Sequence, residues 1–124
     1  MNNFIPIAAR LLMSQIFIVS GFGKLMGFSG TEGYFSSLGI PMPGLVVPLV
    51  ILIELGGGLA LLLGFKTRWV AAVLAAFTIG SALVAHTHFA DQMQMIHFMK
   101  NLAIAGGLLL FVQHGAGSPS VDRR

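Results

Sequence analysis

LVVPLVILIELGGGLALLL, residues 45–63, is an almost unbroken apolar run whose single charged side chain is that of Glu54. About 20 apolar residues in a helix cross the hydrocarbon core of a bilayer. Only 9% of the 124 residues in the chain are charged, against about 25% in an average soluble domain. Hydrophobic residues make up 56% of the chain, which is more than a soluble domain of this size can bury. The composition therefore predicts a membrane protein and excludes a large soluble catalytic module.

Three further apolar stretches accompany this run, at residues 4–22, 69–85 and 95–112. Each is long enough for one transmembrane helix. The sequence therefore predicts an all-α, polytopic membrane protein with a single four-helix domain over residues 1–124. The long gap after the first span contains Ser29-Gly30-Thr31-Glu32, a pattern typical of a capping box. We expect a short helix at residues 30–38, lying on the membrane surface because about ten residues do not span the hydrocarbon.

Positive residues are distributed unequally between the two ends of the expected bundle. Four spans place both termini and the second loop on one side, which carries Lys66, Arg68, Arg123 and Arg124. Cytoplasmic loops of membrane proteins are enriched in Lys and Arg, so we predict cytoplasmic termini. The seven Lys and Arg stand against four acids but form no basic stripe, and a nucleic-acid-binding surface is therefore not expected.

Four charged residues and one amide form the polar cluster expected inside the membrane: Arg10, Lys24, Glu54, Lys100 and Asn101. A charge at mid-span costs roughly 2.5–3.5 kcal/mol on insertion scales, so such residues usually have a function. Helix rise places Glu54 about 12 Å and Lys100 about 6–8 Å from the outer ends of their spans, a difference that a flexible Lys bridges. We expect a Glu54–Lys100 ion pair joined by Asn101, with Arg10 below and Lys24 above. The alternative is a network that only fixes helix register.

The first span carries a polar face at helical spacing. Arg10, Phe17 and Lys24 recur at i, i+7 and i+14, and Ser14 and Gly21 fall on the same side of the helix. We expect this face to point into the bundle.

Ionisable residues also gather at the expected outer mouth of the bundle: His86, His88, Asp91 and His97. Imidazole binds zinc, copper and iron, so these residues are the candidate ligands of a metal or haem. However, His86 and His88 are two residues apart and point to different faces of a continuing helix. A wet interfacial cluster without a bound metal or haem is therefore expected. Cysteine is absent from the chain, which excludes thiolate ligands.

Short motifs follow one another along almost the whole chain. They are SGFGKL at residues 20–25, GIPMP at 39–43, LGFKTR at 63–68, FMKNLAIAGG at 98–107 and SVDRR at 120–124. Together with the intramembrane charges of Arg10 and Glu54, these motifs resemble the DoxX family of small four-span membrane proteins, and especially its short members from Gram-negative bacteria. The resemblance implies a location in the bacterial inner membrane.

The same resemblance implies an accessory subunit of a membrane redox system, since the family is named for a subunit associated with a quinol-oxidising respiratory system. On this interpretation the chain binds a quinone or a similar lipid-soluble ligand, whose head group needs only hydrogen-bond donors beside an apolar slot, and it is not an enzyme on its own. Two alternatives stay open: a small permease or proton pathway centred on Glu54, and a non-catalytic membrane assembly protein. Each leaves room for partner subunits or a homo-oligomer in the lipid bilayer.

Overall fold

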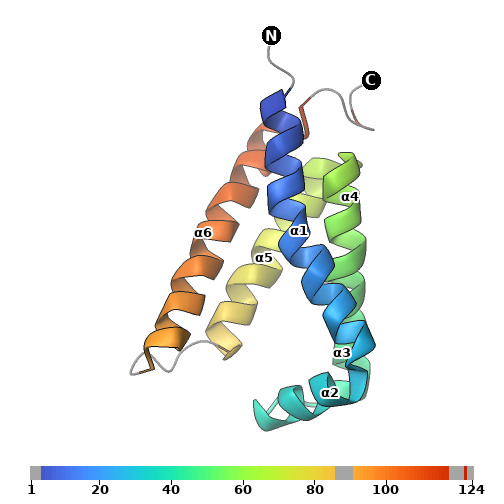
Figure 1. The fold of residues 1–124 in the computed structure, drawn as a ribbon, viewed down its shortest axis with the longest axis vertical. Helices are drawn as coiled ribbons and strands as arrows, with labels where there is room; N and C mark the ends of the chain where they lie inside the picture. The colour runs from blue at the N-terminus through green and yellow to red at the C-terminus, as the bar shows by residue number, and fades with distance from the viewer. Residues whose placement is uncertain (1–3, 86–90, 118–121, 123–124) are drawn as a thin grey trace.

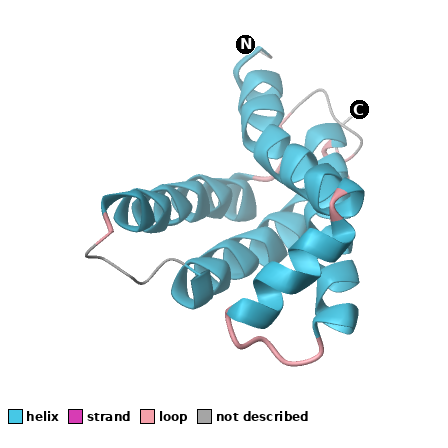
Figure 2. Cartoon of the chain, turned by 60° about the horizontal axis from the view of Figure 1, so that its bottom comes forward, coloured by secondary structure: helices cyan, strands magenta, loops and turns pink. Residues whose placement is uncertain are grey.

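The structure, a computed structural model, describes residues 4–85, 91–117 and 122. Every regular element within these residues is a helix (Figure 2). Four helical segments are long and apolar enough to cross a membrane, namely α1 (Phe4–Met26), a composite segment (Pro43–Leu63), α5 (Thr67–Ala85) and α6 (Gln92–His114). The predicted all-α, four-span fold is therefore confirmed.

The second span is built from three helical pieces. It runs through α3 (Pro43–Ile51), a π-helical turn η1 (Leu52–Gly56) and α4 (Gly57–Leu63). Pro43 occupies the first turn, where its missing N–H is harmless, and Pro48 lies inside α3. Turns of π-helix are rare and frequently occur at functional sites. The one in this span contains Glu54, the buried acid of the apolar run.

The short helix α2 (Phe28–Ser37) follows α1 after a break at Gly27 and lies across the end of the bundle opposite the start of α1 (Figure 1). The predicted capping box is wrong, because Ser29 lies inside the helix and Gly27 takes the N-cap position without a side-chain hydrogen bond. The amide of Thr31 donates to the Gly27 carbonyl over 2.9 Å. A backbone hydrogen bond thus closes the first turn, and the Ser29 side chain does not cap the helix. Gly39, with a φ of +79°, reverses the chain after the helix.

Two glycines, one in α1 and one in the second span, allow these two helices to approach each other closely. A Cβ atom at Gly21 would lie 2.9 Å from the backbone nitrogen of Leu55, and one at Gly58 would lie 3.1 Å from that of Ile18. Neither position accepts a side chain without movement of the backbone, which is the geometry that small residues provide between membrane helices.

The bundle is packed unevenly. α6 packs along α5, whereas it makes far less contact with α1. α1 and α6 diverge from each other along the bundle (Figure 1). The side chains at the centre of the core are those of Phe17, Leu61, Leu74 and Leu108. The buried residues of α1 are Arg10, Ser14, Phe17 and Gly21. They confirm that the polar face expected from the sequence points into the bundle.

The start of α1, the end of α6 and the turn before α5 lie at the same end of the molecule (Figure 1). Asp122 reaches this turn from the C-terminal tail. Its carboxylate accepts hydrogen bonds from the amides of Lys66 (2.7 Å) and Thr67 (2.9 Å), and its own amide donates to the Gly64 carbonyl (2.9 Å). An acid in this position satisfies amides that the first turn of α5 leaves without helical partners.

Candidate functional site

A partly buried ion pair joins the first and second spans. The Nζ atom of Lys24 lies 2.7 Å from Oε1 of Glu54, whose residue is only 6% exposed. The expected Glu54–Lys100 pair is therefore wrong. Two features of the structure explain why Glu54 pairs with Lys24 and not with Lys100. α1 continues to Met26, so Lys24 stays in helical register with the inward face, and Glu54 lies in the π-helical turn, which packs against α1.

A polar pocket of about 200 Å³ lies beside this pair. Side chains of α1, the second span, α5 and α6 line it. They are Ile16, Phe17, Ser20, Lys24, Glu54, Phe77, Thr78, Ser81, His97, Lys100, Asn101 and Ile104. Four of the five residues of the predicted intramembrane cluster, all except Arg10, thus border one space. Lys100 is exposed and stands at its edge.

Asn101 connects α6 to α5 at the wall of the polar pocket. Its Nδ2 atom donates to the Thr78 carbonyl and to Oγ of Ser81, each over 3.3 Å. The expectation that Asn101 joins a Glu54–Lys100 pair is wrong, since both bonds go to α5. The amide therefore fixes the register of these two helices and holds the wall of the pocket in place.

Arg10 is buried at the other end of α1, about 21 Å from Lys24 at 1.5 Å per residue. Its charge acts on Asp122. Partial desolvation raises the pKa of the Asp122 carboxyl, but the hydrogen bonds from the amides of Thr67 and Lys66 and the charge of Arg10 lower it, and the result lies below the usual 3.8. Arg10 thus belongs to an attachment site for the tail. Asp122 went unnoticed in the sequence because its partners are backbone amides, and its only local signal is an acid before Arg123-Arg124.

Of the four candidate metal or haem ligands predicted at the outer mouth, the structure describes Asp91 and His97, which have different roles. His86 and His88 lie outside the described residues. Asp91 caps α6, because its Oδ1 accepts from the amide of Met93 over 3.0 Å. His97 lines the polar pocket. Within the parts of the chain that the structure describes, no three His, Asp or Glu side chains form a group that would hold a metal ion.

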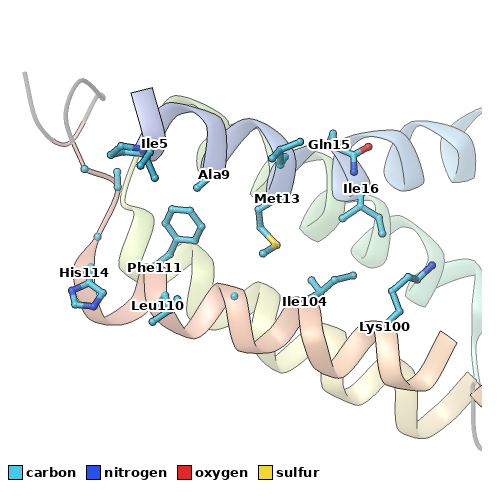
Figure 3. A pocket seen from close by; sticks show the side chains of 16 residues that line it. Ile5, Ala9, Met13, Gln15, Ile16, Lys100, Ile104, Leu110, Phe111 and His114 are labelled. Carbon is cyan, nitrogen blue, oxygen red and sulfur yellow. The ribbon is translucent and has the colours of Figure 1, made fainter. Parts of the chain in front are cut away.

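A lateral groove of about 940 Å³ separates α1 from α6 and opens on the outer surface of the bundle (Figure 3). In Figure 3, Met13 and Ile16 extend from α1 toward α6, and Phe111 extends from α6 toward α1. The groove shares Ile16, Lys100 and Ile104 with the polar pocket. The two spaces therefore lie next to each other.

The family model described as DoxX matches residues 5–87 of the chain. The chain belongs to the DoxX family. The matched segment of this DoxX protein includes Lys24 and Glu54, and therefore the ion pair, whereas Lys100 and Asn101 follow it.

Two relatives of this DoxX protein come from Escherichia coli strain K12. Inner membrane protein YqjF is 47% identical over 117 residues, which cover 94% of this chain and 88% of the relative. Inner membrane protein YphA is 41% identical over 122 residues, with 94% and 86% covered. A third relative, "Putative oxidoreductase CatD" of Bacillus subtilis strain 168, is 34% identical over 74 residues, with 60% and 54% covered. No solved structure matches the chain significantly. These findings identify a DoxX-family inner-membrane protein.

The ion pair of this DoxX protein also borders a second space. A second cavity of about 420 Å³, the α2 cavity, lies between α2 and the ends of the spans next to it, and includes Lys24, Glu54, Phe77 and Ser81 in its lining. The same four residues line the polar pocket. The Lys24–Glu54 pair therefore lies between two cavities, where it can exchange hydrogen bonds with a polar molecule in either one.

Proposed function

We propose that this DoxX protein binds the head group of a quinone in the polar pocket and acts as an accessory subunit of a membrane redox system. One observation carries the proposal: hydrogen-bonding side chains converge beside a partly buried ion pair, at a point where an apolar groove opens toward lipid. Small-molecule sites typically combine an apolar lining with a few polar groups that fix the orientation of the ligand, and this combination suits a lipid-soluble ligand with a compact polar head. The name of the Bacillus subtilis relative, "Putative oxidoreductase CatD", agrees with the redox assignment.

The size and chemistry of the polar pocket suit one substituted ring. Its volume of about 200 Å³ corresponds to about seven water molecules at roughly 30 Å³ each. The ammonium group of Lys100 donates hydrogen bonds to a ring carbonyl, and the carboxylate of Glu54 accepts from a ring hydroxyl. Hydrogen bonds in a medium of low dielectric are stronger than in water. The pocket therefore offers partners to both the oxidised and the reduced head group.

Removal of the Lys100 ammonium tests this proposal. Lys100 is exposed, so Lys100→Met keeps the apolar stem and leaves the bundle folded. A hydrogen bond to a charged group contributes about 1.5–3 kcal/mol, and the quinone affinity is therefore expected to fall at least about tenfold. Quinone that co-purifies in mild detergent is quantified by solvent extraction and chromatography.

Lys66→Met is the matched control, because it removes the same charge from the turn before α5, far from the polar pocket. It is expected to retain quinone at the wild-type level. Wild-type protein without quinone, or equal retention in both variants, contradicts the proposal.

A proton pathway through Glu54 is the second candidate, favoured by the position of the ion pair between the polar pocket and the α2 cavity. Intramembrane carboxylates recur in proton relays. This candidate predicts proton flux in liposomes that is lost in Glu54→Gln and kept in Glu32→Gln, a matched change in α2. An assembly protein gives neither flux nor bound quinone, and only a co-purifying partner.

A further inference from the structure

The lateral groove is too large and too apolar to serve head-group recognition alone. Its volume of about 940 Å³ is several times that of the polar pocket, at about 200 Å³. Of its described lining residues, three carry polar side chains, namely Gln15, Lys100 and His114. Along α1 it extends from Ile5 to Ile16, which is about 16 Å at 1.5 Å per residue. The space therefore has the length and the chemistry for an extended apolar chain.

A glycine keeps this groove open. Gly107 of α6 lines the groove, and a Cβ atom at this position would lie 2.5 Å from Cε of Met13 on α1. A longer side chain would enter the space between the two helices. Gly106, the preceding residue, has no atom within 4 Å of the same virtual Cβ and does not line the groove. A large side chain at Gly107 would therefore displace the flexible end of Met13 and fill part of the groove, whereas one at Gly106 would not.

The position of the groove identifies the head group that its occupant carries. Ile16, Lys100 and Ile104 line both the groove and the polar pocket, so one molecule can lie in both spaces. A single substituted ring has the size of this space, about 200 Å³. A compact ring joined to a long, flexible chain fits the two spaces together.

We infer that the lateral groove holds the polyisoprenoid tail of the quinone whose head lies in the polar pocket, an inference that rests on the proposed function. The tail follows α1 and α6 from Lys100 toward His114 and remains open to lipid along its side. The ligand therefore enters sideways from the bilayer. Tail length then contributes to affinity beyond simple partition into lipid, because the chain contacts Met13 and Phe111.

The test compares two probes with the same benzoquinone head, one carrying a single isoprene unit and the other eight. Affinities are measured for the full-length protein in lipid nanodiscs and expressed as mole fractions of lipid, which removes the difference in partition. The wild-type protein is expected to bind the long probe at least tenfold more tightly than the short one. Gly107→Leu removes this advantage, whereas the affinity for the short probe changes less than about threefold.

Gly106→Leu is the matched control, since it makes the same change on the lipid-facing side of α6, and it is expected to leave both affinities unchanged. Ala9→Leu fills the groove from α1 and gives the same result as Gly107→Leu, which keeps the test valid if one variant does not fold. Lys100→Met weakens both probes and thereby reports on the head group.

Two results overturn the inference while the proposed function stands. In the first, the wild-type protein binds the short and long probes equally. In the second, Gly107→Leu weakens both probes equally or neither of them. Loss of co-purifying phospholipid in Gly107→Leu, with equal affinities for the two probes, assigns the groove to an acyl chain and also overturns the inference. If the wild-type protein binds neither probe, the proposed function itself is wrong, and the inferred site for the polyisoprenoid tail is wrong as well.

Discussion

Lys24, in the last turn of α1, and Glu54, in the π-helical turn of the second span, form an ion pair with an Nζ–Oε1 distance of 2.7 Å. The contact joins residues 30 positions apart in the sequence. Gly21 brings the two helices close enough for it, since its missing Cβ would lie 3.1 Å from Cβ of Glu54. The pair therefore positions the edge of the polar pocket as well as neutralising a buried acid.

Loss of the Lys24 charge is expected to destabilise the protein more than loss of both charges. Lys24→Met leaves Glu54 buried without its partner, a change that typically costs about 3–5 kcal/mol in a buried pair. The Lys24 side chain is 26% exposed, so we expect a smaller loss than in a fully buried pair, about 2–3 kcal/mol. The double variant Lys24→Met/Glu54→Gln recovers most of this loss. Unfolding free energies in mixed micelles measure the cycle, and equal stabilities of the single and double variants would contradict the prediction.

Gly21→Ala is expected to destabilise the protein, whereas Gly23→Ala is not. A methyl group at Gly21 meets the backbone nitrogen of Leu55 at 2.9 Å, and one at Gly23 meets nothing within 4 Å. Overpacking costs about 1–3 kcal/mol, while alanine in an open helical position gains up to about 1 kcal/mol over glycine. The two variants should therefore change the unfolding free energy in opposite directions. A Gly21→Ala protein at least as stable as Gly23→Ala would show that the contact is not tight.

The spans and the inward face of α1 could be predicted because they depend on local properties. Hydropathy over about 20 residues identifies a span, and the spacing of Arg10, Phe17 and Lys24 identifies a helical face. The partner of Glu54 could not be predicted in the same way. It depends on a π-helical turn and on the crossing of two helices, and rise per residue along straight helices favoured Lys100 instead.

The same distinction applies at the two ends of the bundle. Asp91 precedes α6 directly in the sequence and caps it, yet the sequence interpretation placed it in a histidine cluster. Asp122 caps α5 from a position more than 50 residues away. No local pattern identifies a cap that comes from so distant a segment, since Lys66 and Thr67 contribute only backbone amides.

Asn101→Leu is expected to loosen the packing of α6 on α5 without unfolding the protein. The change removes two hydrogen bonds of 3.3 Å, to the Thr78 carbonyl and to Ser81. Interhelical hydrogen bonds of this kind contribute about 0.6 kcal/mol on average in membrane proteins, so a loss of about 1 kcal/mol in unfolding free energy is expected. Ser81→Ala removes one of the two bonds and should cost about half as much. If Ser81→Ala costs more than Asn101→Leu, the amide is not the connecting group.

Attachment of the C-terminal tail of the protein through Asp122 is expected to depend on pH. The pKa of its carboxyl lies below the usual 3.8, so the folded state binds protons more weakly than the unfolded state does. The stabilisation is therefore complete above the usual value and is lost as the pH falls through the lower, folded value. A side-chain cap contributes about 0.5–2 kcal/mol to stability. Because Asp122 is exposed, we expect an effect toward the lower end of this range.

Amide hydrogen exchange at Lys66 and Thr67 provides the direct measurement, because these two amides donate to the Asp122 carboxylate. At about pH 6 the wild-type protein should protect both amides, and Asp122→Ala should expose them. As the pH falls below the usual 3.8 and through the lower pKa of the folded state, the difference between the two proteins should shrink, because the wild-type carboxylate becomes protonated. Asp91→Ala, which removes the cap of α6, should affect Met93 and leave Lys66 and Thr67 protected. Protection of Lys66 and Thr67 that does not change in Asp122→Ala would mean that other groups hold the start of α5.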